Sequence, residues 1–200
     1  MAGRDTIDFK LTGFDKLKDM LEPGKFPQRL ERHVRKATAK VGLIAEGAVK
    51  TAITQGDFAK NRPMTIAQKG SDRPLVDSGE LLKAITSEVE DWDRVVVGVI
   101  KDQTVQGEDG KPDSIKSIAA ILHSGATIEV TDKMRAFFRH MADKFERGEI
   151  KKPWRPLKAS TKVLVIKKRP FMERALRKRY QDRYQAIWAA AVQKAMSGAS

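Results

Sequence analysis

The stretch TSEVEDWDRVVVGVI, residues 86–100, holds two runs of residues that favour strands, separated by a short polar segment. Valine, isoleucine and threonine suit the extended backbone of a strand. The four residues Asp91-Trp92-Asp93-Arg94 between the runs are typical of a turn. We therefore expect strands over 86–90 and 95–100, joined as a hairpin, and hence an antiparallel sheet.

Long amphipathic segments lie on both sides of this hairpin in the chain. From about residue 27 to 55 apolar residues recur every three or four positions, which is the spacing of one helix face, and Gly56 follows. A second helix is predicted from about Phe171 to Met196, with an apolar stripe that we expect to dock on the sheet. That stripe consists of Met172, Leu176, Tyr180, Tyr184, Ile187 and Trp188.

Shorter elements are expected between the long helices. Asp77 and Glu80 resemble a capping box at the start of a short helix. Ser114 is expected to open another helix that Gly125 closes, followed by a brief strand over 127–130. The run 163–166 is four apolar residues long, which is typical of a central strand.

An inserted amphipathic helix is predicted to be capped by Asp132, with Gly148 just past its C-terminal end. Its apolar face, which is expected to be core or a subunit interface, consists of Met134, Phe137, Phe138, Met141 and Phe145. The segments 57–74 and 101–113 contain proline and glycine without apolar periodicity, so both are expected to be long loops.

Together these elements predict a single α+β domain over residues 1–200. Its small, mostly antiparallel sheet is packed by a long N-terminal and a long C-terminal helix, and residues 131–160 form the inserted helix and its linker.

Composition excludes several classes of protein. The chain has 200 residues, of which 40% are hydrophobic, so it can bury a core. It has no cysteine, which excludes disulfides, thiolate zinc sites, iron–sulfur clusters and a cysteine nucleophile. No run approaches the roughly 18 apolar residues of a membrane span, and the first ten residues lack the apolar core of a secretory signal. We expect a soluble protein made in the cytoplasm.

The formal net charge is +13, and this excess is segregated along the chain. Residues 167–183 hold eight basic and two acidic residues, and residues 25–50 hold seven basic and two acidic ones. Acidic residues predominate instead between Glu88 and Asp113. The basic segments are either solvated faces or surfaces for an acidic partner.

No pattern predicts catalysis, a metal site or a cofactor. His33, His123 and His140 are far apart in the sequence, and no nucleophile elbow or phosphate-binding loop occurs. Gly107 and Gly110 lie in an acidic segment, which disfavours phosphate. We expect no enzyme activity.

Several short motifs occur along the chain in a characteristic order. They are LVDSGEL (75–81), VVVG (95–98), AAILHSG (119–125), VTDKMR (130–135) and RPF (169–171). In this order they resemble the virion-morphogenesis and tail-completion proteins of tailed bacteriophages, which include head–tail joining and tail terminator proteins. The motif residues are Asp77, Ser78, Gly79, Gly98, His123, Gly125, Arg169, Pro170 and Phe171.

These motif residues look architectural rather than chemical. Asp77 suits a helix cap, Gly79 and Gly98 permit close backbone approach, and Pro170 suits the start of a helix.

The resemblance implies a structural neck protein without a cofactor. It implies a ring, which we expect to be a hexamer, that caps the tail tube and joins it to the head–tail connector. Such a subunit would be assembled in the host cytoplasm and lie at the head–tail junction of the virion, without membrane contact.

The candidate interface is the basic C-terminal face, which is expected to meet the acidic 88–113 region of a neighbouring subunit. It comprises Arg174, Arg177, Lys178, Arg179 and Arg183.

An alternative is a nucleic-acid-binding protein that uses its two basic helices. Against it, aromatic residues make up only 6% of the chain, and its three tryptophans are not interleaved with the basic residues as a stacking platform requires. We expect at most non-specific contact with genomic DNA.

Overall fold

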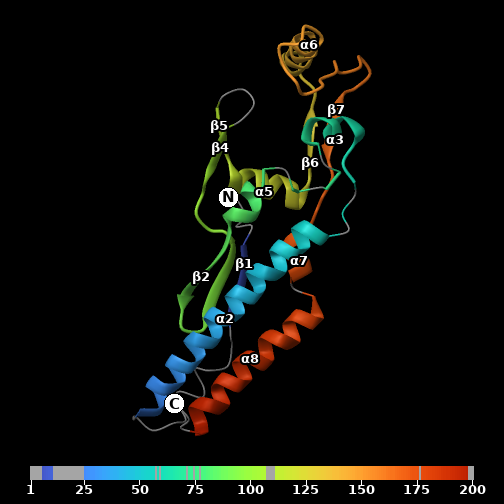
Figure 1. The fold of residues 1–200 in the computed structure, drawn as a ribbon. Helices are drawn as coiled ribbons and strands as arrows, with labels where there is room; N and C mark the ends of the chain where they lie inside the picture. Colours follow the sequence, from blue (N-terminus) through green and yellow to red (C-terminus); the bar gives the residue numbers. More distant parts are fainter. Residues whose placement is uncertain are drawn as a thin grey trace.

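A computed structural model describes residues 6–10, 25–56, 58, 60–70, 72–73, 75–76, 78–106, 111–175 and 177–197. The fold is α+β, as predicted, with long N-terminal and C-terminal helices packed against small antiparallel sheets (Figure 1).

The largest sheet has three antiparallel strands in the order β1-β3-β2. They are β1 (Thr6–Lys10), β2 (Ile85–Asp91) and β3 (Arg94–Val99). The predicted hairpin is confirmed: β2 and β3 pair with Ile85 opposite Val99 and Val89 opposite Val95, and only Trp92 and Asp93 form the turn.

The long helix α2 (Lys25–Gln55) crosses this sheet (Figure 1) and packs on β2 and β3. Its predicted apolar stripe is mostly buried. Leu30, Val34 and Val41 are shielded from solvent, as are Val95 and Val97 of β3.

The C-terminal segment forms two helices rather than the single one predicted. They are α7 (Phe171–Ala175) and α8 (Lys178–Ser197), with Arg177 in a bend between them and Leu176 outside the described part. Helix α8 runs beside α2 in the opposite direction (Figure 1). Its stripe therefore docks mainly on α2 rather than on the sheet, although the Tyr184 ring lies 5.0 Å from that of Phe9 on β1.

A buried hydroxyl joins these layers. Thr38 of α2 is fully buried and donates to the carbonyl oxygen of Trp92 at 2.8 Å. Its Oγ1 also accepts a hydrogen bond of 3.0 Å from the indole Nε1 of Trp188 on α8. One threonine thus holds α2, α8 and the hairpin turn together.

Both predicted loops contain regular structure, so those predictions are wrong in part. Helix α3 (Pro63–Lys69) lies within 57–74. Proline suits the first turn because its φ is fixed and its missing N–H would have no helical partner. Gly70 then ends α3 with a φ of 70°. Strands β4 (Thr104–Gln106) and β5 (Pro112–Ser114) pair within and beside 101–113, where Gly107 and Gly110 lie outside the described residues.

Two of the predicted helix starts need correction. Helix α4 (Glu80–Ala84) has Gly79 as its N-cap, so Glu80 is the first helical residue and the capping box is wrong; Asp77 itself lies outside the described part. Helix α6 (Asp132–Glu146) is capped by Thr131, whose hydroxyl accepts from the Met134 N–H at 3.3 Å, and not by Asp132. Helix α5 (Ile115–Ser124) begins at Ser114 and ends at Gly125, as predicted.

The inserted helix belongs to an arm that extends from the body (Figure 1). Its stem is a separate antiparallel ribbon of β6 (Ala126–Glu129) and β7 (Val163–Ile166). The prediction of a central strand at 163–166 is therefore wrong. Val163 and Val165 are 44% and 51% exposed, because β6 is the one strand partner of β7 among the described residues and alternate side chains face outward.

Candidate functional site

The motif residues of the chain's second half converge where α5 ends and α7 begins. The backbone N–H of Arg169 donates to the carbonyl oxygen of Leu122 at 3.0 Å. The imidazole of His123 lies edge-on to the Phe171 ring at 5.2 Å between centroids, and Phe171 is fully buried. Residues about 48 positions apart in the sequence are therefore in contact, which explains an architectural role for both motifs.

Gly125 permits this junction. Its φ is 77°, and a Cβ there would lie 2.9 Å from both the Ile166 oxygen and the Lys168 nitrogen. Both the left-handed backbone and the close approach require glycine. Gly79 differs from expectation: its φ is 83°, and no atom of the described residues lies within 4 Å of a Cβ there, so its left-handed backbone is what favours glycine.

The other motif residues have separate positions. Gly98 lies in the central strand β3, opposite Thr6 on one side and Thr86 on the other. Pro170 directly precedes α7, as expected. Ser78 lies beside α4, where its Oγ accepts a long hydrogen bond of 3.5 Å from the Glu80 N–H.

Ser78, Gly79 and Arg169 line one hollow of about 300 Å³, here called the Arg169 hollow. Its other walls come from α3, α4, β4 and α5, so motif residues from both halves of the chain meet around it. Within the described residues the guanidinium of Arg169 has one side-chain partner: its Nη2 donates to Asn61 Oδ1 at 3.2 Å. Burial lowers the pKa of Arg169.

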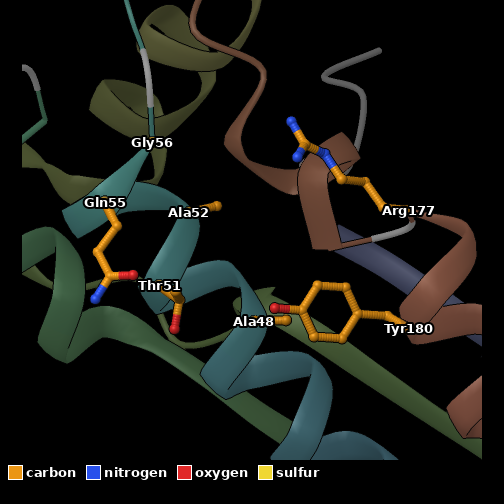
Figure 2. A pocket seen from close by; sticks show the side chains of 7 residues that line it. All are labelled: Ala48, Thr51, Ala52, Gln55, Gly56, Arg177 and Tyr180. Atoms are coloured by element: carbon orange, nitrogen blue, oxygen red, sulfur yellow. The ribbon is translucent and has the colours of Figure 1, made fainter.

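The candidate basic interface is only partly described. Arg177 and Arg183 are exposed, whereas the side chains of Arg174, Lys178 and Arg179 lie outside the described part. A hollow of about 140 Å³ lies between the end of α2 and the α7–α8 bend. Figure 2 shows its lining residues, with Tyr180 pointing toward Ala48 and Arg177 at the edge.

A second basic surface was missed in the sequence, because it needs two helices to form. A groove of about 400 Å³ runs between α2 and α8. Basic side chains from both helices border it, and small apolar residues of α8 form its floor. It is lined by His33, Lys36, Ala37, Lys40, Arg183, Ala186, Ile187, Ala190, Ala191 and Lys194. The basic residues on the polar face of α2 were the available signal, but only the packing of α8 beside them makes the groove.

The acidic region 88–113 divides into two roles. Thr86, Glu88 and Glu90 are exposed at alternate positions of β2, whereas Ser87 faces α2 and donates to Glu46 Oε2 at 2.9 Å. Because side chains alternate along a strand, Glu88 and Glu90 lie on the sheet face away from α2. Asp102 instead accepts hydrogen bonds from Ser114 Oγ and the Lys116 N–H at the start of α5. Asp102 is therefore structural.

The sheet face that carries Glu88 and Glu90 lies on the other side of the α2 layer from the basic groove, and Glu90 on this face pairs with Arg94 at 3.3 Å. Gly42 of α2 faces the sheet, since a Cβ there would lie 2.6 Å from Val95 Cγ2. Lys36, Lys40 and His33 lie about 120–180° around the helix from Gly42, at 100° per residue.

In the part of the chain that the structure describes, no three histidine or acidic side chains gather as a metal site would require. No helix among those residues has the length and apolar content to cross a bilayer. Comparison of the chain with protein families, curated proteins and solved structures gave no match.

Proposed function

We propose that this chain is a structural neck subunit of a tailed bacteriophage, which forms a ring that caps the tail tube and joins it to the head connector. The order of the motifs in the sequence suggests this function. The observation that supports it most is that the motif residues His123, Gly125, Arg169 and Phe171 meet at one junction. Each acts there through packing or backbone conformation, which suits an assembly subunit rather than an enzyme.

The distribution of charge supports a ring. A contact between two different surfaces of identical subunits closes into a ring when the rotation allows it. Glu88 and Glu90 on the outer sheet face, where Glu90 also pairs with Arg94, are opposite in charge to the basic groove on the other side, and complementary charge fixes register between neighbours. A sixfold ring would match a sixfold tube, and its partners would be copies of itself, the tail tube and the connector.

The nucleic-acid alternative is favoured by one observation, the basic residues on both walls of the groove. Its described lining is apolar and basic but contains no tryptophan, tyrosine or phenylalanine on which bases would stack. In this proposal the chain makes at most weak, sequence-independent contact with DNA.

Negative-stain electron microscopy of the full purified chain tests the proposal, alongside duplex DNA binding measured by fluorescence anisotropy. We expect sixfold rings, and weak DNA binding at about 0.15 M salt. Monomers at every concentration, together with tight DNA binding whose affinity falls steeply with salt, would support the alternative and overturn the ring.

A further inference from the structure

The Arg169 hollow has the form of a binding site, which the architectural role of the motifs does not explain. Its volume of about 300 Å³ is at the lower end of the range for ligand pockets. Apolar side chains from three elements and a connecting segment form most of its wall, namely Leu75, Leu81, Val105, Ile115, Ile118 and Leu122. Such a wall suits one or two apolar side chains.

Arg169 supplies a positive charge at the edge of this apolar wall. Its position is fixed by two backbone hydrogen bonds, from its own N–H to Leu122 O at 3.0 Å and from the Phe171 N–H to its carbonyl oxygen at 2.7 Å. Its guanidinium donates to Asn61, so both the backbone and the tip of the Arg169 side chain are held beside the hollow.

The guanidinium lacks an anionic partner among the described residues. Its Nε is buried and has no hydrogen-bond acceptor there. Glu80 also lines the hollow, but its carboxylate pairs with Lys83 at 2.8 Å. A partly buried cation without a counter-ion is costly, and a carboxylate is the group that guanidinium geometry fits best.

Leu75 indicates that the wall of the hollow is shaped at some cost. It is buried, yet its φ is 68°, a left-handed conformation that is rare for a branched, bulky residue. Such conformations persist where surrounding structure imposes them, and they cluster at binding sites.

We propose that the Arg169 hollow binds a peptide segment of another protein, which inserts a large apolar side chain and places an adjacent carboxylate on Arg169. The carboxylate belongs either to the C-terminus of that segment or to an Asp or Glu side chain. Phosphate-rich ligands suit the site less well, because most of its wall is apolar.

The test uses three short probes and the full chain labelled at isoleucine and leucine methyl groups for NMR. The probes are N-acetyl-Leu-Leu with a free C-terminus, the same dipeptide as its amide, and N-acetyl-Asp-Leu-Leu amide. We expect a carboxylate probe at millimolar concentration to shift the methyl signals of Ile115, Ile118 and Leu122, and the dipeptide amide to bind about tenfold more weakly or worse. Which of the two acidic probes binds better distinguishes a C-terminal carboxylate from a side-chain one.

Variants assign the binding to this hollow. Arg169→Gln should weaken the acidic probe about tenfold or more, whereas Arg177→Gln, at the separate hollow of Figure 2, should leave it unchanged. Because Arg169→Gln also removes a structural contact, Ile118→Trp provides a second route: it fills the hollow, keeps Arg169 and should abolish binding. Methyl signals that no probe shifts, equal binding of the dipeptide and its amide, or equal losses in the Arg169 and Arg177 variants would overturn the proposal.

Discussion

Gly42 shows how one residue sets the distance between α2 and the sheet. A Cβ at this position would lie 2.6 Å from Val95 Cγ2 and 3.2 Å from Ser87 Cβ. At Gly47, five residues further along the same helix, no atom of the described part of the chain lies within 4 Å of the corresponding Cβ position. The two glycines therefore lie on the same helix but differ in the room available for a side chain.

We expect Gly42→Ala to lower the free energy of unfolding by about 1–3 kcal/mol, because the added methyl forces helix and strand apart. Gly47→Ala is the matched control and should raise it by about 0.5–1 kcal/mol through helix propensity. Urea unfolding followed by circular dichroism measures both. If the two substitutions have the same sign, the close approach at Gly42 is wrong.

The buried hydroxyl of Thr38 has a structural role, because it makes hydrogen bonds to two other segments of the chain. Thr38→Val keeps the shape but leaves the Trp188 N–H without its acceptor, so it should cost about 1–3 kcal/mol. Thr38→Ser keeps the hydroxyl and should cost less. Thermal unfolding followed by tryptophan fluorescence compares them, and a larger loss for Thr38→Ser than for Thr38→Val would show that the methyl group matters more than the hydrogen bonds.

At the scale of elements, the arm shows how an amphipathic helix is held away from the main core. Arg135 of α6 donates from Nη1 to Lys158 O at 3.0 Å and from Nη2 to Thr161 O at 2.6 Å, which fixes the segment that returns to β7. Trp154 of that segment packs edge-on against Phe137 and Phe138, with centroids 5.6 and 5.4 Å away. The apolar face of α6 is thus covered in part by its own linker.

Substitutions at the two adjacent phenylalanines of α6 can distinguish a role in local packing from a role in assembly. Phe138 is half-buried, so Phe138→Ala should cost about 2 kcal/mol, below the range of about 3–5 kcal/mol for a fully buried ring. Phe137 is 39% exposed, so Phe137→Ala should change stability less. If the face contacts a neighbour, Phe137→Ala should still reduce the fraction of rings seen by electron microscopy. Normal rings from a stable Phe137→Ala protein would exclude this face as an interface.

At the scale of the whole molecule, the opposed charged faces predict a specific pattern of rescue. Changing Lys36, Lys40, Arg183 and Lys194 to Glu together reverses both walls of the basic groove, and Glu88→Lys with Glu90→Lys reverses the outer sheet face. Each of these two variants should fail to form rings alone, since like charges then meet. An equal mixture should form alternating rings, because every contact again pairs opposite charges.

Sedimentation velocity and electron microscopy of the single variants and the mixture measure this rescue. Lys133→Glu with Arg139→Glu on the exposed side of α6 is the control and should leave rings intact. Rings in either charge-reversed variant alone, or none in the mixture, would show that these two faces do not meet; wild-type rings would still support the proposed function.

What the sequence by itself determined was local. The spacing of Leu30, Val34 and Val41 predicted α2, and the residues around Trp92 predicted the hairpin, because each depends on neighbours within one or two turns of chain. Ser114 and Gly125 marked the ends of α5 through the same short-range chemistry. The resemblance of the motifs pointed to the proposed function, but not to where those motifs meet.

Tertiary structure decided what depends on distant partners. The run 163–166 is apolar enough for a central strand, yet in the described structure it pairs with β6 on one edge, and its exposure follows from that pairing rather than from its composition. The basic groove needs Lys36 and Arg183 on two packed helices, and the Arg169 hollow needs Asn61 and Leu122 beside an arginine far along the chain. Periodicity reports which face of an element is apolar, whereas the contact that covers this face is set by packing between segments whose separation in sequence leaves no local pattern.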